Sequence, residues 1–160
     1  MTAALMTGRL HVAQMNIARL VAPDHDPRVA EFMAGLDPVN AIADASPGFV
    51  WRLTGEGNNA TDLRPWGGDV IVNMSVWETP QHLRAFFRDP AHQAYFARRA
   101  EWFVPMEGPH VVLWWVPIGH EPTPGEGRER LDHLVEHGPT AHAFTLGAIR
   151  APVTSEQPCV

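Results

Sequence analysis

Cysteine, clustered positive charge and long apolar runs are all scarce in this sequence. The one cysteine, Cys159, stands next to the last residue, so no disulfide can form within the chain. With a formal net charge of −6 and no run of arginines or lysines, we expect no nucleic acid partner. No apolar run reaches the length of a membrane span, and residues 1–12 lack the basic and apolar regions of a signal peptide. We therefore expect a cytoplasmic protein without a membrane partner.

Charged residues as a whole are few, at 19% of the chain, whereas tryptophan is abundant, with six among 160 residues. A chain of this length has room for one domain with a real hydrophobic core. Tryptophan is unfavourable to bury unless its ring N–H finds a partner, so the enrichment indicates an interface or a ligand cavity. A core that is simply rich in tryptophan is the alternative, and the composition leaves both open.

The hydrophobic periodicity predicts four main strands and four helices. The strands are expected at residues 10–20, 49–54, 69–77 and 110–116, with a short candidate strand at 143–146. Helices are expected at 27–45, from 79 to a break at Pro90, from 89 to about 103, and at about 124–137. Pro38 lies inside the first helix and predicts a kink or break near Asp37.

The predicted order of elements is typical of the ferredoxin-like, split βαβ arrangement, an α+β fold. We expect a single domain over residues 1–160, with a core at about 10–117, a C-terminal helical extension at about 118–148 and a tail at 149–160. The sheet of this fold carries helices on one face only, yet these strands are apolar on both faces. A second subunit would cover the other face, so we expect a homodimer with the two sheets facing each other, a dimeric α/β barrel.

A long polar, glycine-rich loop separates the second and third predicted strands, at residues 55–68. Its spacing lacks both the Walker A and the dinucleotide-binding patterns, so we do not expect a phosphate site. A loop of this length in a small domain is either mobile or a lid. Trp66 lies within it, and we expect its ring to dock on another part of the protein.

The helix predicted from residue 89 presents an aromatic face that also carries a histidine and an arginine. At helical spacing this face gathers His92, Tyr95, Phe96, Arg99, Trp102 and Phe103. Because a plain core has no use for an arginine, we interpret the face as one wall of a binding pocket. The opposing strands supply the polar and aromatic residues Asn16, Asn73, Ser75 and Trp77. The alternative is a core histidine beside an arginine that is paired with a carboxylate.

The sequence gives weaker support to two other kinds of site, a metal site and a nucleophilic one. His133 and His137 stand four residues apart on one helix, with Glu129 one turn earlier, which would suit zinc. No third ligand is fixed by the spacing, so a solvated helix face is favoured and no metal is expected. Nucleophilic catalysis is not expected, because Cys159 falls in the tail and no G-x-S-x-G motif occurs.

A heme site is the alternative for the pocket itself. His92 would be the axial ligand, and His11 or His110 could act from the strands. Such a heme would be non-covalent, since no C-x-x-C-H motif is present.

Three segments carry a resemblance to a known family: NMSVWET at 73–79, HQAYFARRAEWF at 92–103, and VLWWVPIGHEPTPGEGRERLDHLVEHGPTAHAFTL at 112–146. Together they resemble domain of unknown function family 3291. That family resembles the dimeric α/β-barrel superfamily, which includes cofactor-independent monooxygenases of antibiotic biosynthesis, heme enzymes, isomerases and ligand-sensing domains. The resemblance implies a ferredoxin-like fold and transfers no catalytic residue.

The leading functional hypothesis is a small-molecule enzyme of secondary metabolism that resembles a cofactor-independent monooxygenase and acts on an aromatic or polyketide-like substrate. His92 would be the base, and Arg99 and Asn73 would hold the developing oxyanion. Binding of the substrate is assigned to Asn16, Trp66, Trp77, Tyr95, Trp102 and Trp115. A redox-neutral cyclase or isomerase, a heme protein, and a binding module without chemistry are the alternatives that the sequence leaves open.

Overall fold

The computed structural model describes residues 10–153, which form one antiparallel sheet with helices packed against it. The four longer strands lie in the order β2–β3–β1–β5, and a two-residue β4 pairs with the far end of β1. Every pairing is antiparallel. This is the strand order of the ferredoxin-like fold, so the predicted fold class is confirmed. The strands are β1 (Leu10–Leu20), β2 (Phe49–Arg52), β3 (Val70–Trp77), β4 (Phe103–Val104) and β5 (Val111–Pro117).

The four predicted helices begin where the sequence predicts, because each of these starts combines a capping side chain with a proline at the first helical position. The caps Asp26, Thr79, Asp89 and Thr123 each accept a hydrogen bond from a backbone N–H two or three residues later. Among the described residues no helix is long and apolar enough to cross a membrane. The helices are η1 (Pro27–Val29), α2 (Ala30–Ala45), α3 (Pro80–Phe87), α4 (Pro90–Ala97), α5 (Arg99–Trp102) and α6 (Pro124–His137).

Two departures from the predicted helices concern single residues. The helix predicted from residue 89 to 103 breaks at Arg98 (φ −98°, ψ 8°), which separates α4 from α5. The break lets the chain turn back to the sheet, where the N–H of Val21 donates to the carbonyl of Trp102 and β4 joins β1. The predicted break near Asp37 is absent, since α2 continues through Pro38 while it packs on β2 and α4.

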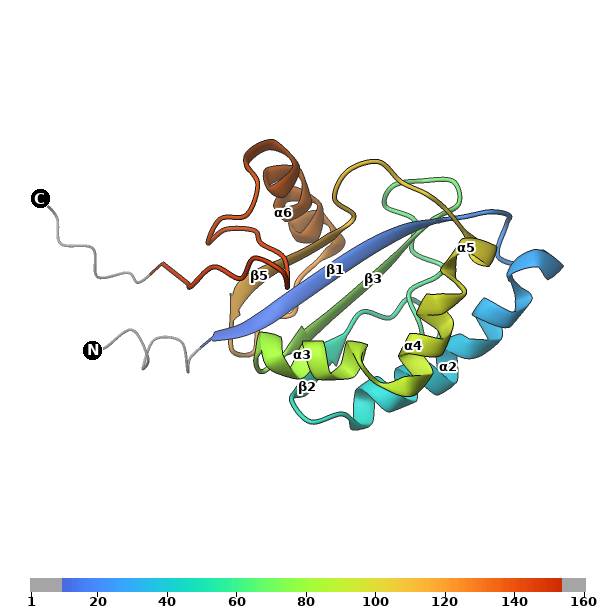
Figure 1. The fold of residues 1–160 in the computed structure, drawn as a ribbon, viewed down its shortest axis with the longest axis horizontal. Coiled ribbons are helices and arrows are strands. Elements are labelled where there is room, and N and C mark those ends of the chain that lie inside the picture. The colour runs from blue at the N-terminus through green and yellow to red at the C-terminus, as the bar shows by residue number, and fades with distance from the viewer. Residues whose placement is uncertain (1–9, 154–160) are drawn as a thin grey trace, which may run out of the picture.

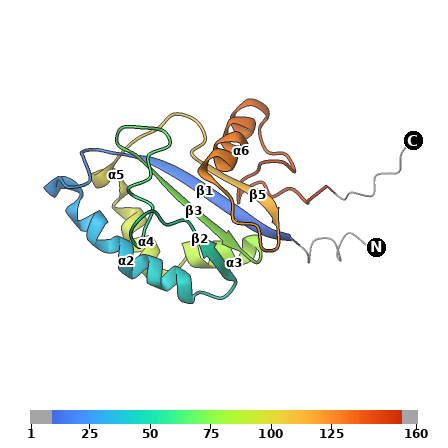
Figure 2. The ribbon, with the colours of Figure 1, turned by 180° about the vertical axis from the view of Figure 1, so that it is seen from behind.

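The two faces of the sheet are covered by different parts of the chain (Figures 1 and 2). Alternate residues of β1 point to opposite faces. Val12 packs with Trp77 of β3 and Leu83 of α3, which places α2 and α3 over that face. Met15 and its neighbours on β3 and β5 pack instead against Leu131 and Leu134 of α6. The C-terminal extension is thus a layer of the fold.

The face covered by α6 is the one for which a partner subunit was expected. Its strand residues are buried within this single chain: Ala13, Met15, Ile17, Val70, Val72, Met74, Val76, Val112, Trp114 and Val116. Ala60, Leu63 and Trp66 of the long loop complete the cover beside α6. The homodimer was predicted because an exposed apolar sheet face would need a cover, and in this chain α6 and the loop cover that face. The homodimer therefore stays a prediction, but this argument no longer supports it.

Glycine at position 127 brings α6 onto the sheet. A Cβ atom at Gly127 would lie 2.4 Å from the sulfur of Met15 and 3.2 Å from the terminal methyl of Met74. The helix is also fixed by Glu126, whose carboxylate accepts a hydrogen bond of 2.8 Å from the ring N–H of Trp114. Close approach and a partly buried hydrogen bond together hold this layer in place.

Candidate functional site

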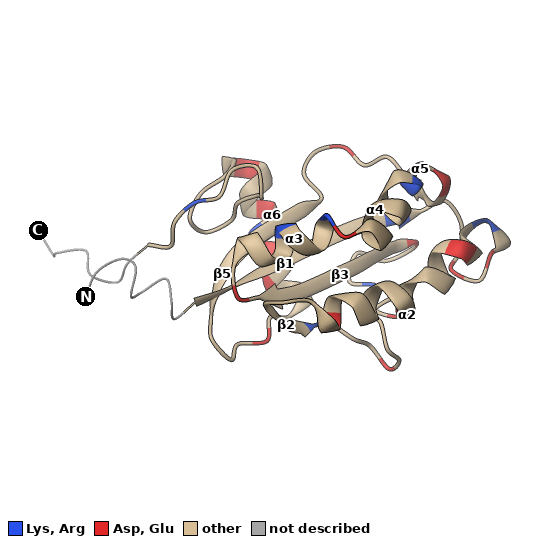
Figure 3. Cartoon of the chain, turned by 60° about the horizontal axis from the view of Figure 1, so that its bottom comes forward, with Lys and Arg blue, Asp and Glu red and all other residues tan. Residues whose placement is uncertain are grey.

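A cavity of about 430 Å³ lies between the sheet and the helices α2 to α5. Figure 3 looks onto this helix layer, with β1 and β3 behind α2 and α4. The cavity is lined by side chains of β1 and β3, by apolar residues of α2, and by aromatic and polar residues of the segment from α3 to α5. Its volume is within the range of about 300–1,000 Å³ that small-molecule sites occupy. The helix face interpreted as a pocket wall does border a cavity.

The strands give the cavity a polar floor, which we call the amide cluster: Gln14, Asn16, Asn73 and Ser75. The side-chain N–H₂ of Gln14 donates to the amide oxygen of Asn73 and to the hydroxyl of Ser75, both at 2.8 Å. The N–H₂ of Asn16 donates to the amide oxygens of Gln14 at 3.2 Å and of Asn73 at 3.4 Å. These bonds explain how polar side chains are accommodated in the middle of a sheet.

Asn73 shows that the cavity opens to solvent. It is exposed, although every other residue of β3 is buried. Its amide oxygen accepts the bonds within the amide cluster, and its N–H₂ has no partner within residues 10–153. Asn73 therefore presents two free donors to whatever occupies the cavity.

His92 borders the cavity from α4 with its ring held between two aromatic neighbours. The ring centroid lies 5.1 Å from that of Phe86 and 5.0 Å from that of Phe87. Its Nδ1 is buried without a hydrogen-bond partner in the described part of the chain. Burial lowers the pKa of His92 below its ordinary 6.5, against smaller opposing effects of the Phe87 carbonyl and Asp89. At neutral pH the imidazole is neutral and can accept a proton.

Arg99 supplies a positive charge at the same cavity. Its guanidinium lies 4.1 Å from the ring centroid of Phe96 and donates to the Phe96 carbonyl at 2.9 Å. No carboxylate among the described residues forms an ion pair with it. The alternative in which Arg99 pairs with a carboxylate is thus not what the structure shows.

Its neighbour Arg98 behaves in the opposite way. The guanidinium of Arg98 pairs with Glu101 and Glu31, and these hydrogen bonds raise its pKa. Charged segments of both signs meet where α5 lies near the start of α2 (Figure 3). Arg98 therefore ties α5 to α2. Arg52 also lines the cavity but pairs with Asp44, so Arg99 is the lining arginine without an ion pair among the described residues.

Of the aromatic residues predicted to bind substrate, three line the cavity: Trp77, Tyr95 and Trp102. Trp77 and Trp102 are also buried in the hydrophobic core. Trp77 is fully buried, is stacked on Phe86, and donates from its ring N–H to Ser75 at 2.9 Å. Trp102 is 2% exposed and has its centroid 5.7 Å from that of Tyr95. Tyr95 lies against Gly35 of α2, where a Cβ atom would stand 2.3 Å from the phenol ring.

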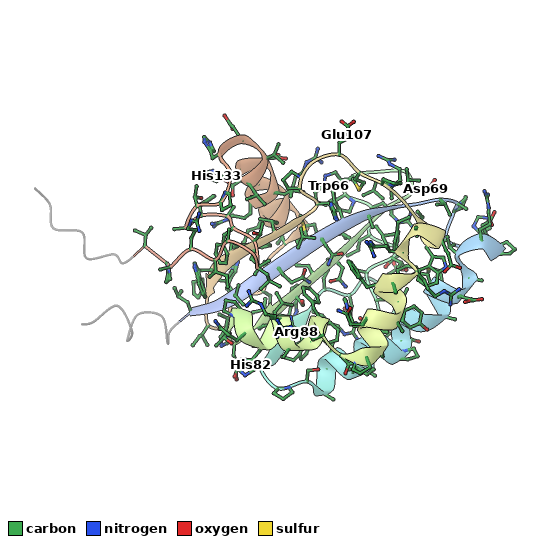
Figure 4. The ribbon with its side chains drawn as sticks, viewed as in Figure 1. Trp66, Asp69, His82, Arg88, Glu107 and His133 are labelled. Atoms are coloured by element: carbon green, nitrogen blue, oxygen red, sulfur yellow. The ribbon has the colours of Figure 1, made fainter. Side chains whose placement is uncertain are left out.

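Trp66 and Trp115 do not line the cavity. Trp66 packs on the opposite face of the sheet, with the guanidinium of Arg128 5.4 Å from its ring (Figure 4). Trp115 packs on Phe144 and donates its ring N–H to the carbonyl of Arg150 at 2.8 Å. Both rings have partners elsewhere, so the structure gives neither of them a role at this cavity.

Hydrogen bonds and ion pairs fix both ends of the long loop at residues 55–68. Arg64 donates to the carbonyls of Thr61 and Gly68 at 2.7 and 2.9 Å and pairs with Asp24 at 3.1 Å. Arg52 anchors its other end through Asp44 and Asn58. The loop contributes Asn59, Ala60 and Thr61 to the end of the cavity.

A second cluster of titratable side chains lies at α6, outside this cavity. The described residues bring Glu129, His133 and His142 together, with one ligand atom of each within 4.8 Å of the others. Burial, then the neighbouring His137 and His142, lower the pKa of His133. The sequence analysis paired His133 with His137 and missed His142, because His142 arrives from the segment after the helix.

The comparisons place the chain in a family. The model of a family described as Domain of unknown function (DUF3291) matches residues 11–158. No curated protein matches the chain.

Three solved structures illustrate what the chain is similar to. One is a conserved protein from Methanosarcina mazei Go1, at 11% identity and a TM-score of 0.49, covering 71% of this chain and 97% of that one. SnoaB, a cofactor-independent oxygenase from Streptomyces nogalater, is similar at 17% identity and a TM-score of 0.45, covering 71% and 97%. A dimeric ferredoxin-like protein of unknown function from Thermobifida fusca is similar at 16% identity and a TM-score of 0.41, covering 68% and 92%.

The resemblance read from the three sequence segments is confirmed. Since the family model spans nearly all of the chain, this protein belongs to the DUF3291 family.

Proposed function

We propose that this protein is a small-molecule enzyme that resembles a cofactor-independent monooxygenase and acts on an aromatic or polyketide-like substrate. One observation supports this above all. A neutral imidazole and an arginine with no carboxylate partner among residues 10–153 border the same solvent-open cavity, whose floor is the amide cluster. A base, a cation and amide donors around an apolar space are the groups that proton abstraction from an electron-rich phenol or enol requires.

The chemistry assigns a role to each group. His92 takes the proton, and its lowered pKa keeps it in the basic form at neutral pH. The free N–H₂ of Asn73 and the guanidinium of Arg99 stabilise the negative charge that develops on the substrate oxygen. Phe86 and Phe87, which are half-buried, provide the aromatic wall against which a flat substrate packs, and the fully buried Trp77 supports this wall from behind through its stacking on Phe86.

The atoms and electrons of the proposed oxygenation balance without a cofactor. The deprotonated substrate gives its electrons to dioxygen, one oxygen atom enters the substrate and the other leaves as water. A methylene then becomes a carbonyl: R₂CH₂ + O₂ → R₂C=O + H₂O. Both electron pairs come from the substrate, so no external reductant is needed.

Oxygen uptake is the experiment that tests this proposal. The purified protein is offered a panel of polycyclic phenols with an acidic methylene, while dissolved oxygen and product mass are followed. We expect one O₂ consumed per product, with a mass gain of one oxygen minus two hydrogens. The matched control for His92→Ala is His25→Ala, because His25 is a strongly exposed histidine that does not line the cavity, and this variant should leave the rate unchanged.

Three other outcomes would contradict the oxygenase. A product of unchanged mass without oxygen uptake indicates a cyclase or isomerase that uses the same groups. Binding of the panel with no product at all indicates a binding module. A Soret band on hemin titration that is lost in His92→Ala indicates a heme protein with His92 as axial ligand. The cytoplasm stays the location that we expect.

A further inference from the structure

The cluster on α6 is built from two parts of the chain that meet only in the fold. Glu129 and His133 lie one turn apart on α6, and His133 is visible on this helix in Figure 4. His142 belongs to the segment that follows the helix. Its Nε2 lies 2.8 Å and 2.9 Å from the two carboxylate oxygens of Glu129, and its ring centroid lies 4.6 Å from that of His133.

The segment that carries His142 is fixed against the helix by its own hydrogen bonds. The hydroxyl of Thr140 contacts Nε2 of His133 at 3.1 Å and accepts the backbone N–H of His142 at 3.2 Å. Two residues later, Phe144 exchanges two backbone hydrogen bonds of 2.8 and 2.9 Å with Leu113 of β5. The three side chains of the cluster are therefore brought together by a folded segment rather than by chance contact of mobile groups.

We propose that Glu129, His133 and His142 form a zinc site that ties the segment from residue 139 to 146 to α6. Two imidazole nitrogens and one carboxylate oxygen are donors that zinc prefers, and they exclude calcium, which takes oxygen ligands. Tetrahedral zinc with bonds of about 2.0–2.1 Å keeps its ligand atoms roughly 3.3 Å apart. The observed atoms, within 4.8 Å of one another, reach that spacing by side-chain rotation. Water takes the fourth position.

Arg130 shows what changes when the metal binds. Its Nη1 donates to Nδ1 of His142 at 2.8 Å and to the carbonyl of the same residue at 2.9 Å. With Nδ1 as an acceptor, Nε2 of His142 carries the proton and donates to Glu129. With zinc on Nε2, the neutral ring of His142 would carry its proton on Nδ1, so Arg130 would give up its bond to Nδ1 and keep its bond to the carbonyl.

Calorimetric titration of the chelator-treated Cys159→Ser protein with zinc chloride alone tests the site. The substitution removes the one thiol. We expect one zinc per chain, and at least a tenfold loss of affinity in both His142→Ala and Glu129→Gln. At a zinc concentration about 100-fold above the dissociation constant, the melting temperature of the parent should rise by roughly 5 °C or more, and those of His142→Ala and Glu129→Gln should not.

His137→Ala is the matched control, because its ring centroid lies 4.4 Å from that of His133 on the same helix. The proposed site needs His142 and not His137, so this variant should keep the affinity of the parent. If zinc binds a plain pair of helical histidines, His137→Ala loses affinity and His142→Ala keeps it, and the proposal is overturned. Unchanged zinc affinity in Glu129→Gln would overturn the proposal as well. Because Glu129 is exposed on α6, this substitution should not disturb folding, so the test does not depend on whether His142→Ala folds.

Discussion

At the scale of single residues, the charge state of His92 decides what the cavity can do. Burial of the ring, whose Nδ1 has no hydrogen-bond partner in the described part of the chain, penalises the imidazolium and lowers the pKa below 6.5. The neutral form is the active base, and it is lost only when the pH falls through this lowered value. We therefore expect the acidic limb of the pH profile of kcat/KM to lie below pH 6.5. A limb at or above pH 7 would contradict the assignment.

The amide cluster makes a prediction about stability at the same scale. Gln14 is 1% exposed and bonds to three polar neighbours, so Gln14→Leu leaves these groups with fewer partners. We expect the free energy of unfolding to fall by about 1–3 kcal/mol in urea titration. Gln81→Leu is the matched control, since Gln81 is exposed on α3, and should change it by less than about 0.5 kcal/mol. Equal stability of the two variants would show that the cluster is not a structural unit.

The sequence predicted some of these residues and not others, for physical reasons. His92, Arg99 and Asn73 could be found because a charge or an amide interrupts an apolar helix face or strand. Trp66 and Trp115 were predicted to bind substrate, but they do not line the cavity, because an aromatic side chain fits a core and a cavity equally well. Their partners, Arg128 and the Arg150 carbonyl, come from segments distant in sequence.

At the scale of elements, local signals were strong at the helix starts and at the ends of α2 and α6, and they were weak at the boundary between α4 and α5. An aspartate or threonine followed by proline begins η1, α3, α4 and α6, as expected. The break at Arg98 has no local signal, because it follows from the pairing of β4 with β1 and from the ion pairs of Arg98. Tertiary contacts decide such boundaries.

The packing of α6 on the sheet gives the prediction that belongs to this scale. A side chain at position 127 meets Met15 and Met74 in a filled core, so Gly127→Leu should destabilise the protein by about 1–3 kcal/mol. In Gly125→Leu, two residues earlier on the helix, the added Cβ has only Thr123 Oγ1 nearby, at 3.8 Å. Thermal or urea unfolding of the two variants should therefore differ. Similar stabilities would mean that α6 does not lie close to the sheet.

At the scale of the whole molecule, the C-terminal extension covers the second face of the sheet. A sheet with helices on one side leaves an apolar face, and here α6 and the long loop bury it within one chain. The sequence indicated the apolar second face of the sheet and the helix at about 124–137. It did not show that the two meet, because that contact depends on Gly127 and on the path of residues 118–123.

The predicted homodimer is open to a direct check. Size-exclusion chromatography with light scattering at micromolar concentration should give twice the chain mass of 17.7 kDa if the dimer forms. With α6 in place, such a dimer would use a surface other than the covered sheet face. A mass of one chain would contradict the prediction.

The central claim is that His92 acts as a base on a molecule held in the cavity between the sheet and helices α2 to α5. The most direct test is kcat/KM of His92→Ala, compared with the parent, on a substrate found by oxygen uptake. We expect a fall of about 10²–10⁴-fold, with the far-UV circular dichroism and the melting curve of a folded protein. A kcat/KM within threefold of the parent would remove His92 from the mechanism and contradict the account.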